Sequence, residues 1–155
     1  MILYLVRHGD AKNKNEDPSR GLSDNGIADI KRVAGHLAGL NVRVERIFHS
    51  GKLRATQTAQ IMADAVGTDY PITETDGLAP MDDPGIWYER ICEMNYDAML
   101  VGHLPYLSIL SALLLSRTQD NRFVEFETGG VACFERAKDC RWELKWKTGP
   151  ESIQK

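Results

Sequence analysis

Hydrophobic and polar positions along much of the chain follow two spacings, one typical of strands and one typical of helices. Residues 2–6 form a continuous apolar run, which favours a strand covered on both faces of a sheet. The polar stretch 10–21 predicts an exposed loop, and from Ser23, a candidate N-cap, the apolar positions take helical spacing as far as Gly39. A strand followed by a helix is therefore the first unit that the pattern predicts.

The same order repeats further along the chain. Residues 46–49 predict a strand, and after the Ser50-Gly51 turn a helical pattern continues until Gly67. A third strand is predicted at 71–75, followed by a helix at 84–94, and a fourth strand at 98–101, followed by a helix at 105–116. Strands and helices in alternation favour a parallel sheet with helices on its faces.

The C-terminal part carries strand-like patterns only. Residues 123–127 and 131–135 predict a hairpin around Gly129-Gly130. In residues 141–147 apolar and charged side chains alternate, which indicates a strand with one solvated face, and the apolar ones are Trp142, Leu144 and Trp146.

These patterns together predict a single α/β domain over residues 1–150. We expect a three-layer sandwich, with a mostly parallel central sheet, flanking helices and an antiparallel C-terminal edge. Residues 151–155 are expected to form a disordered tail.

Composition narrows the class of protein. The 155 residues are 43% hydrophobic and 26% charged, close to the globular average, which argues against disordered, collagen-like and coiled-coil proteins. The net charge of −3 provides no overall positive field for nucleic acid or an anionic membrane, so any anion site must be local. The longest apolar stretch, 104–115, is shorter than the roughly 20 helical residues that cross a bilayer.

Cysteine usage and the N-terminus bear on the compartment. Cys92, Cys133 and Cys140 form no C-x-x-C pair, and an odd number cannot be fully paired within one chain. The N-terminal apolar run has no basic region before it and stops at Arg7, so we expect no export signal. A reducing, cytoplasmic location fits these features.

Candidate chemistry lies at the ends of predicted strands, where open α/β sheets bind their ligands. His8 follows the first strand and His103 follows the strand at 98–101. Arg7 precedes His8, and Arg54 lies at the start of the helix that follows the strand at 46–49. Two histidines and two arginines are therefore expected at one crevice.

This set of side chains suits a phosphoryl group. Guanidinium groups donate paired hydrogen bonds to phosphate oxygens, and a neutral imidazole is a nucleophile. Gly9 is expected to let the backbone approach the phosphate closely, because a Cβ there could obstruct its oxygens. Phosphoryl transfer is the reaction class that these residues favour.

Each residue also has a structural interpretation. A single histidine after a strand is more often a loop residue with a satisfied hydrogen bond, and Arg54 alone would be a solvated helix residue. Arg7 could simply form a surface ion pair with Asp10 or Glu16. His36 and His49 are assigned no role.

Metal and nucleotide sites are the competing interpretations. A zinc site could draw on His8, His49, His103, Asp10 and Asp82, but no H-x-x-x-H or C-x-x-C spacing exists and the arginines would repel a cation. We expect no metal and no cofactor. The G-x-x-x-x-G-K-[ST] and G-x-G-x-x-G motifs of nucleotide-binding proteins are also missing from the sequence.

Several motifs in order along the chain resemble the histidine phosphatase superfamily, whose fold is phosphoglycerate mutase-like. They are Arg7-His8-Gly9, Leu22-Ser23-Asp24-Asn25-Gly26, the S-x-x-x-R-A-x-Q-T-A segment from Ser50 to Ala59, and Gly102-His103. The short length, the Arg7-His8-Gly9-Asp10-Ala11 start and Gly102-His103-Leu104-Pro105 are most similar to the SixA-type phosphohistidine phosphatases.

The resemblance implies roles for the four residues. His8 would be the nucleophile that is transiently phosphorylated, Arg7 and Arg54 would bind the phosphoryl oxygens, and His103 would donate to them in the transition state. Water would then hydrolyse the phosphohistidine, without a metal or an organic cofactor.

One segment departs from the family pattern. Larger members carry a glutamate general acid in an E-L-x-P-like segment, and here Gly77 occupies the matching place in the stretch 75–80. An alkoxide leaving group needs a proton from such an acid, whereas an imidazole can leave already protonated on its other nitrogen. Asp76, Asp82 or Asp83 could take over as the acid, or they could be solvated loop carboxylates.

The sequence therefore favours a cofactor-independent phosphatase that hydrolyses protein phosphohistidine through a phosphohistidine enzyme intermediate. A small-molecule phosphomonoesterase of the same superfamily is the first alternative, and an inactive phosphate-binding module is the second. The expected partner is a phosphohistidine-bearing protein or a small phosphorylated substrate. We expect no binding to nucleic acid or to a membrane, and we expect the protein to be a monomer or a small oligomer.

Overall fold

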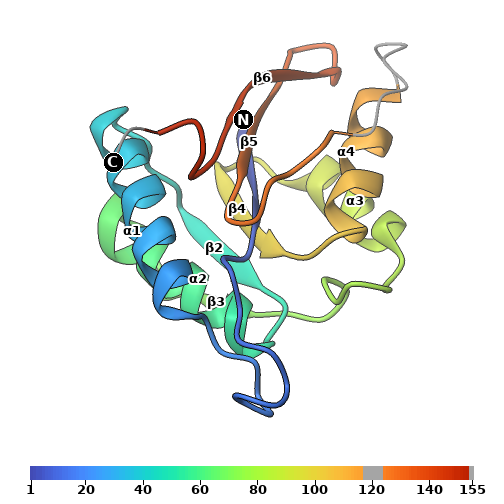
Figure 1. The fold of residues 1–155 in the computed structure, drawn as a ribbon. Helices are drawn as coiled ribbons and strands as arrows, with labels where there is room; N and C mark the ends of the chain where they lie inside the picture. The colour runs from blue at the N-terminus through green and yellow to red at the C-terminus, as the bar shows by residue number, and fades with distance from the viewer. Residues whose placement is uncertain (117–123, 154–155) are drawn as a thin grey trace.

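The computed structural model describes residues 1–116 and 124–153, in which strands and helices alternate until the last two strands (Figure 1). The elements are β1 (Ile2–Arg7), α1 (Asp24–Gly39), β2 (Arg46–His49), α2 (Leu53–Val66), β3 (Thr73–Glu74), α3 (Pro84–Glu93), β4 (Ala98–Gly102), α4 (Tyr106–Leu115), β5 (Val131–Arg136) and β6 (Trp142–Thr148).

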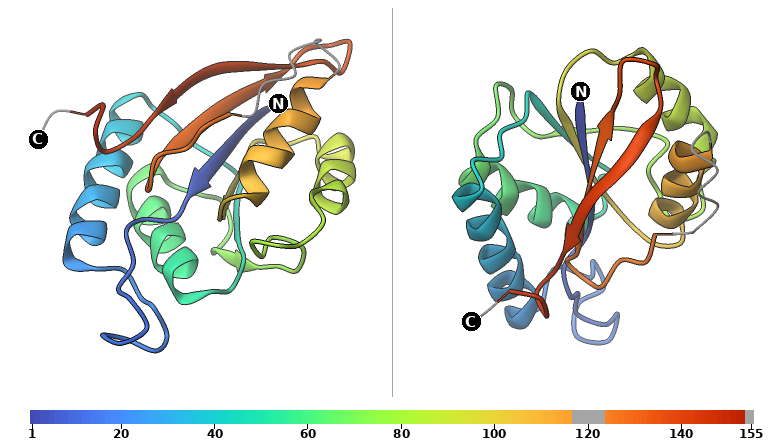
Figure 2. Two further views of the ribbon diagram at one scale, coloured as in Figure 1. Left: turned by 45° about the vertical axis from the view of Figure 1, so that its right-hand side comes forward. Right: turned by 90° about the horizontal axis from the view of Figure 1, so that it is seen from above.

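The strands form a mixed sheet in the order β3-β2-β4-β1-β5-β6. The first four strands in this order are parallel, and β5 and β6 are antiparallel additions next to β1. Figure 2 shows α1 and α2 on one face of the sheet and α3 and α4 on the other. The predicted three-layer α/β sandwich with an antiparallel C-terminal edge is confirmed.

The central strand β1 explains why its sequence is continuously apolar. Leu3 and Leu5 belong to the core under α3 and α4, whereas Tyr4 and Val6 belong to the core under α1 and α2. Because both faces are covered, each leucine is completely buried, which contributes roughly 1.5–3 kcal/mol per side chain.

Helices α1 and α3 each begin with a side-chain cap, and the cap at Ser23 was predicted. The Ser23 hydroxyl accepts the Gly26 N–H at 3.0 Å at the start of α1. At α3, the Asp83 carboxylate accepts the Gly85 N–H at 2.9 Å, and Pro84 occupies the first helical position. Both helices therefore begin at the carboxyl edge of the sheet with a side-chain cap.

The hairpin predicted for residues 123–127 and 131–135 is wrong. Phe123 lies outside the described residues, and residues 124–127 form no strand. The partners of β5 are β1 and β6, both antiparallel. Val124 and Phe126 are buried because this segment packs into the core under α4, so their alternation reflects burial without strand pairing.

The regular alternation predicted for residues 141–147 is interrupted by a bulge. Phe134 pairs with Leu144 but its neighbour Cys133 pairs with Trp146, so Lys145 is the extra residue. Trp146 consequently packs on the α1 and α2 side, where its ring lies 6.1 Å from that of Tyr4. The strand therefore contributes apolar side chains to both faces of the sheet.

The C-terminal segment lies beside α1 (Figure 1). The Glu151 N–H donates to the Glu127 carboxylate at 2.8 Å, and Arg32 of α1 donates to the Pro150 carbonyl at 3.2 Å. Residues 154–155 of the predicted tail lie outside the described residues. None of the helices that the structure describes has the length and apolar character to cross a membrane.

Candidate active site

The two predicted histidines meet at the carboxyl edge of the sheet. Strands β1 and β4 are adjacent and parallel, with Arg7 opposite Gly102, and the His8 N–H donates to the Gly102 carbonyl at 3.0 Å. The first residue after β4 is His103, whose ring centroid lies 5.0 Å from that of His8 at an interplanar angle of 54°. On the other side, the His8 carbonyl accepts the Gly129 N–H at 3.0 Å. The main chain of His8 is therefore held from both sides.

The His8 imidazole is oriented by its own neighbour. Its Nδ1 lies 2.7 Å from the Gly9 carbonyl oxygen, and since a carbonyl only accepts hydrogen bonds, Nδ1 must carry the proton. Burial lowers the pKa of His8 to about 4, assisted by the positive charges of Arg54 and Arg7 and opposed by the bond to Gly9. At neutral pH the ring is therefore neutral, with a lone pair on Nε2.

The two arginines supply the positive charge of the site. Arg7 donates from one terminal nitrogen to the Phe126 carbonyl at 2.9 Å, and Arg54 lies in the first turn of α2. Burial lowers the pKa of both groups, but an arginine remains charged at neutral pH. Among the residues that the structure describes, the buried Nε of each arginine has no hydrogen-bond partner. These N–H groups can donate to the oxygens of an anion.

His103 is paired with a residue to which the sequence motif gave no separate role. Its Nε2 lies 2.7 Å from the Ser50 hydroxyl oxygen, while its Nδ1 is buried without a partner in the described chain. A proton on Nδ1 would leave an unsatisfied buried N–H, so the favoured tautomer donates from Nε2 to Ser50. Burial lowers the pKa of His103 to about 3, with smaller contributions from His8 and Arg54, so this ring is also neutral.

Thr58 links the loop after β1 to the first turn of α2 through two hydrogen bonds. Its hydroxyl accepts the Gly9 N–H at 3.1 Å and donates to the Arg54 carbonyl at 2.8 Å. Thr58 is completely buried, and it is the threonine of the S-x-x-x-R-A-x-Q-T-A motif. This threonine of the motif therefore holds Gly9 and Arg54 in a fixed relative position.

The reason for glycine at position 9 differs from the expected one. A Cβ on Gly9 would lie 2.7 Å from Cγ1 of Ile30 and 3.3 Å from the Gly26 carbonyl oxygen, both in α1. The Gly9 N–H is already bonded to Thr58. The missing side chain thus allows α1 to pack closely against the loop, and a phosphate would not find a free donor on Gly9.

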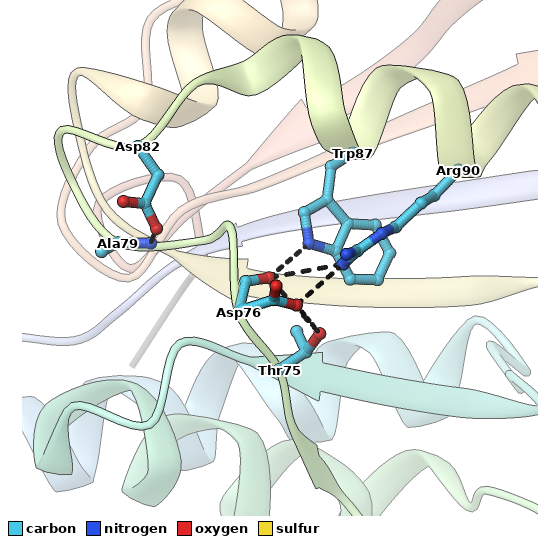
Figure 3. Close-up of polar contacts among 6 residues, drawn as sticks. All are labelled: Thr75, Asp76, Ala79, Asp82, Trp87 and Arg90. Atoms are coloured by element: carbon cyan, nitrogen blue, oxygen red, sulfur yellow. Dashed lines mark hydrogen bonds and ion pairs between the residues drawn. The ribbon is translucent and has the colours of Figure 1, made fainter.

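The three candidate acids are engaged in local structure, and Figure 3 shows two of them. Asp76 pairs with Arg90 at 3.2 Å, Asp82 accepts the Ala79 N–H at 2.9 Å, and Asp83 caps α3. The hydrogen bond and charge of Arg90 lower the pKa of Asp76, which keeps this carboxyl ionised at neutral pH. Asp76 is therefore poorly suited to deliver a proton.

Gly77 has a backbone conformation that disfavours the family's glutamate. Its φ is +81°, in the left-handed region, and a Cβ there would lie 3.1 Å from the Trp87 ring. The Trp87 indole N–H donates to the Asp76 carbonyl at 2.9 Å and fixes this turn (Figure 3). The backbone conformation at position 77 therefore favours glycine over the glutamate of the family pattern.

The remaining candidates for a metal site are dispersed. The His49 Nδ1 accepts the Gly51 N–H at 3.1 Å, which fixes the turn that carries Ser50. Asp10 accepts a hydrogen bond from the Ser23 hydroxyl at 2.6 Å, at the start of α1. Within residues 1–116 and 124–153, no group of three or more His, Cys, Asp or Glu side chains is arranged to hold a metal ion.

Comparison with protein families matches residues 3–90 to the histidine phosphatase superfamily (branch 1). The chain belongs to the histidine phosphatase superfamily. The matched range contains Arg7, His8, Arg54 and Ser50, and His103 follows it.

Comparisons by sequence and by structure both find SixA phosphatases. The chain is 29% identical over 159 aligned residues to the phosphohistidine phosphatase SixA of Escherichia coli (strain K12), covering 99% of this chain and 97% of that protein. The solved structure of the protein histidine phosphatase SixA complexed with tungstate has a TM-score of 0.86 and 26% identity, covering 97% of each chain. These similarities support the SixA-type branch and a phosphatase activity.

The fold is shared with phosphatases of small molecules as well. A phosphoserine phosphatase variant from Entamoeba histolytica in complex with phosphoserine has a TM-score of 0.70 at 16% identity, covering 99% of each chain. At this identity the likeness concerns the fold alone.

Proposed function

We propose that the protein is a cofactor-independent phosphohistidine phosphatase, with His8 as the nucleophile and a protein phosphohistidine as its substrate. The proposal draws on the SixA relatives and, within the site, on one observation above others. The aspartates nearest to the family's acid position, Asp76, Asp82 and Asp83, are each bonded to a neighbouring group, so none is poised as a general acid.

In the first step the Nε2 lone pair of His8 attacks the phosphorus of the substrate. A P–N bond forms to His8 as the substrate's P–N bond breaks, and the substrate imidazole leaves with the electron pair. A leaving imidazole that is protonated on its other nitrogen departs as a neutral ring and needs no acid from the enzyme.

In the second step water displaces His8 from phosphorus. The Nδ1 proton of His8 stays bonded to the Gly9 carbonyl, so the phosphorylated ring carries a positive charge and is a good leaving group. Water supplies the new oxygen of inorganic phosphate, its second proton passes to phosphate or solvent, and the electron pair returns to Nε2. Arg7 and Arg54 stabilise the charge on the phosphoryl oxygens in both steps, and His103 joins them when its Nε2 proton turns from the Ser50 hydroxyl to a phosphoryl oxygen.

The substrate class can be tested through the leaving group. We expect a phosphohistidine protein and aryl phosphates of acidic phenols to react well, and log rate to fall steeply with leaving-group pKa, because no proton is delivered. A flat plot, with alkyl phosphates hydrolysed as fast as aryl ones, would favour the small-molecule phosphomonoesterase instead. Phosphate binding without any turnover would favour the inactive binding module.

The nucleophile can be tested by rapid quench with labelled substrate. The trapped phosphoenzyme should be labile in acid and stable in base, as expected of a phosphohistidine, and His8→Ala should abolish it. His36→Ala is the matched control, because His36 is an exposed residue of α1 outside the site. Label that persists on the His8→Ala enzyme would exclude His8.

A further inference from the structure

The loop between β1 and α1, residues 10–23, is folded back on itself in an ordered way. Ala11 and Leu22 form an isolated antiparallel bridge, and the Lys12 N–H donates to the Gly21 carbonyl at 2.9 Å. The Ser23 N–H donates to the Asp10 carbonyl at 2.9 Å. The returning half of the loop therefore runs beside the residues that directly follow His8 and Gly9.

The same half of the loop lies against α2 at Arg54. The Leu22 N–H donates to the Gln57 side-chain oxygen at 2.7 Å. A Cβ on Gly21 would lie 3.1 Å both from that oxygen and from Cδ2 of Leu53. Leu53 and Gln57 lie one turn apart on α2, on the face next to Arg54, so the residue before Gly21, which is Arg20, is carried to the edge of the phosphoryl site.

The backbone of Arg20 is held in an unfavourable conformation. Its φ is +50°, in the left-handed region, which costs roughly 1–2 kcal/mol for a residue with a side chain. The Arg20 N–H donates to the Asp17 carbonyl, and the Asp17 carboxylate accepts the N–H groups of Ser19 and Gly21 at 3.0 and 2.9 Å. Strain that the surrounding structure holds in place is common at functional sites.

The Arg20 side chain has little to satisfy its charge. It is partly buried, and its Nε donates to the Lys12 carbonyl at 3.1 Å. No carboxylate of the described residues forms an ion pair with it, nor with Arg7 or Arg54. The charge of Arg20 also lowers the pKa of both His8 and Arg54, so the positive charges of Arg20 and Arg54 repel each other. A dianion among them would relieve that repulsion.

We propose that Arg20 is a third guanidinium of the site and binds the phosphoryl group of the substrate together with Arg7 and Arg54. The inference rests on the proposed function only in taking a phosphoryl group as the ligand. The Nε bond to Lys12 fixes the base of the guanidinium and leaves its terminal nitrogens available to phosphoryl oxygens.

The test is the affinity of the whole protein for inorganic phosphate, measured by titration calorimetry. Arg20→Gln removes the charge, and Arg20→Gly removes the side chain while suiting the left-handed backbone. Both should weaken phosphate binding about 10- to 100-fold, as expected for the loss of a hydrogen bond to a charged group. Arg20→Lys should recover part of the affinity. Lys14→Gln removes an exposed charge of the same loop and should change affinity less than about 2-fold.

A second readout separates binding from loop structure. Removing a nearby cation should raise the pKa of His8 in Arg20→Gln, as followed by NMR titration, and Lys14→Gln should leave it unchanged. Phosphate affinity equal to that of the wild type in Arg20→Gln and Arg20→Gly, with unchanged thermal midpoints, would overturn the inference. The wild type could then still hydrolyse phosphohistidine, so the two proposals fail separately.

Discussion

Burial of two neutral histidines makes the stability of the protein depend on pH in a predictable direction. The pKa of His8 is about 4, against an ordinary value of 6.5 that applies in the unfolded chain. Between these values the unfolded state binds a proton that the folded state does not, so stability falls as pH falls from about 6.5 to about 4. At about pH 5 the loss is the 1.5-unit distance from 6.5 multiplied by 1.36 kcal/mol, or about 2 kcal/mol.

Urea unfolding of wild type and His8→Gln at about pH 7.5 and about pH 5 measures this term. The wild type should lose about 2 kcal/mol more than the variant between the two pH values, because glutamine does not titrate. Taking the difference between the two pH values cancels any effect of the substitution on packing that does not depend on pH. Equal losses in the two proteins would show that His8 titrates alike in the folded and unfolded states, and the proposal that His8 acts as a neutral nucleophile would lose its physical basis.

Two further predictions concern the role of Arg54 in phosphate binding and the packing of α1. Arg54→Lys keeps the charge but loses the planar fork, so kcat/KM should fall by about 10²-fold, and activity near that of the wild type would place Arg54 outside the site. Gly26→Ala should destabilise the fold by about 1–3 kcal/mol in thermal unfolding, since its Cβ would overlap the Asp10 carbonyl. Gly35→Ala in the same helix meets nothing within 4 Å and should stabilise by about 0.5–1 kcal/mol, and the opposite ranking would contradict the packing argument.

The sequence was most informative where an apolar run ends in a polar residue. The runs before His8 and His103 predicted two strands, and strands that belong to strand–helix units are parallel, so both histidines were expected at one edge. Arg54 followed from the helical spacing after the Ser50-Gly51 turn. These inferences depend only on the spacing of apolar residues and on the parallel direction of the strands, and both follow from the local sequence.

Other features depend on contacts between distant segments, which the period cannot reveal. Val124 and Phe126 alternate like strand residues, yet they fill the core from a loop. Lys145 is one of several charged residues in β6, and nothing in its type marks it as the bulge. The glycine at position 9 was predicted to make room for a phosphate, whereas the atoms that a Cβ there would meet belong to α1.

Arg20 was missed because the polar loop around it has no apolar period. The available signal was local: Asp17, Ser19 and Gly21 are turn-forming residues that surround one arginine. Likewise, the hydroxyl groups of Ser50 and Thr58 stood in the motif, but their partners, His103 and Gly9, come from other parts of the chain.

The main chain of His8, the proposed nucleophile, is anchored on both sides, so the residue has no local route to disorder. Its N–H is bonded to β4, its carbonyl to the Gly129 amide, and the Arg7 N–H to the Gly130 carbonyl. These bonds tie His8 to the ends of the central strands β1 and β4 and to the segment before β5, so we expect His8 to belong to the cooperative unit that unfolds globally. A destabilising mutation elsewhere in the core should therefore lower activity through the folded fraction, while the molecules that remain folded keep the rate constant of the wild type.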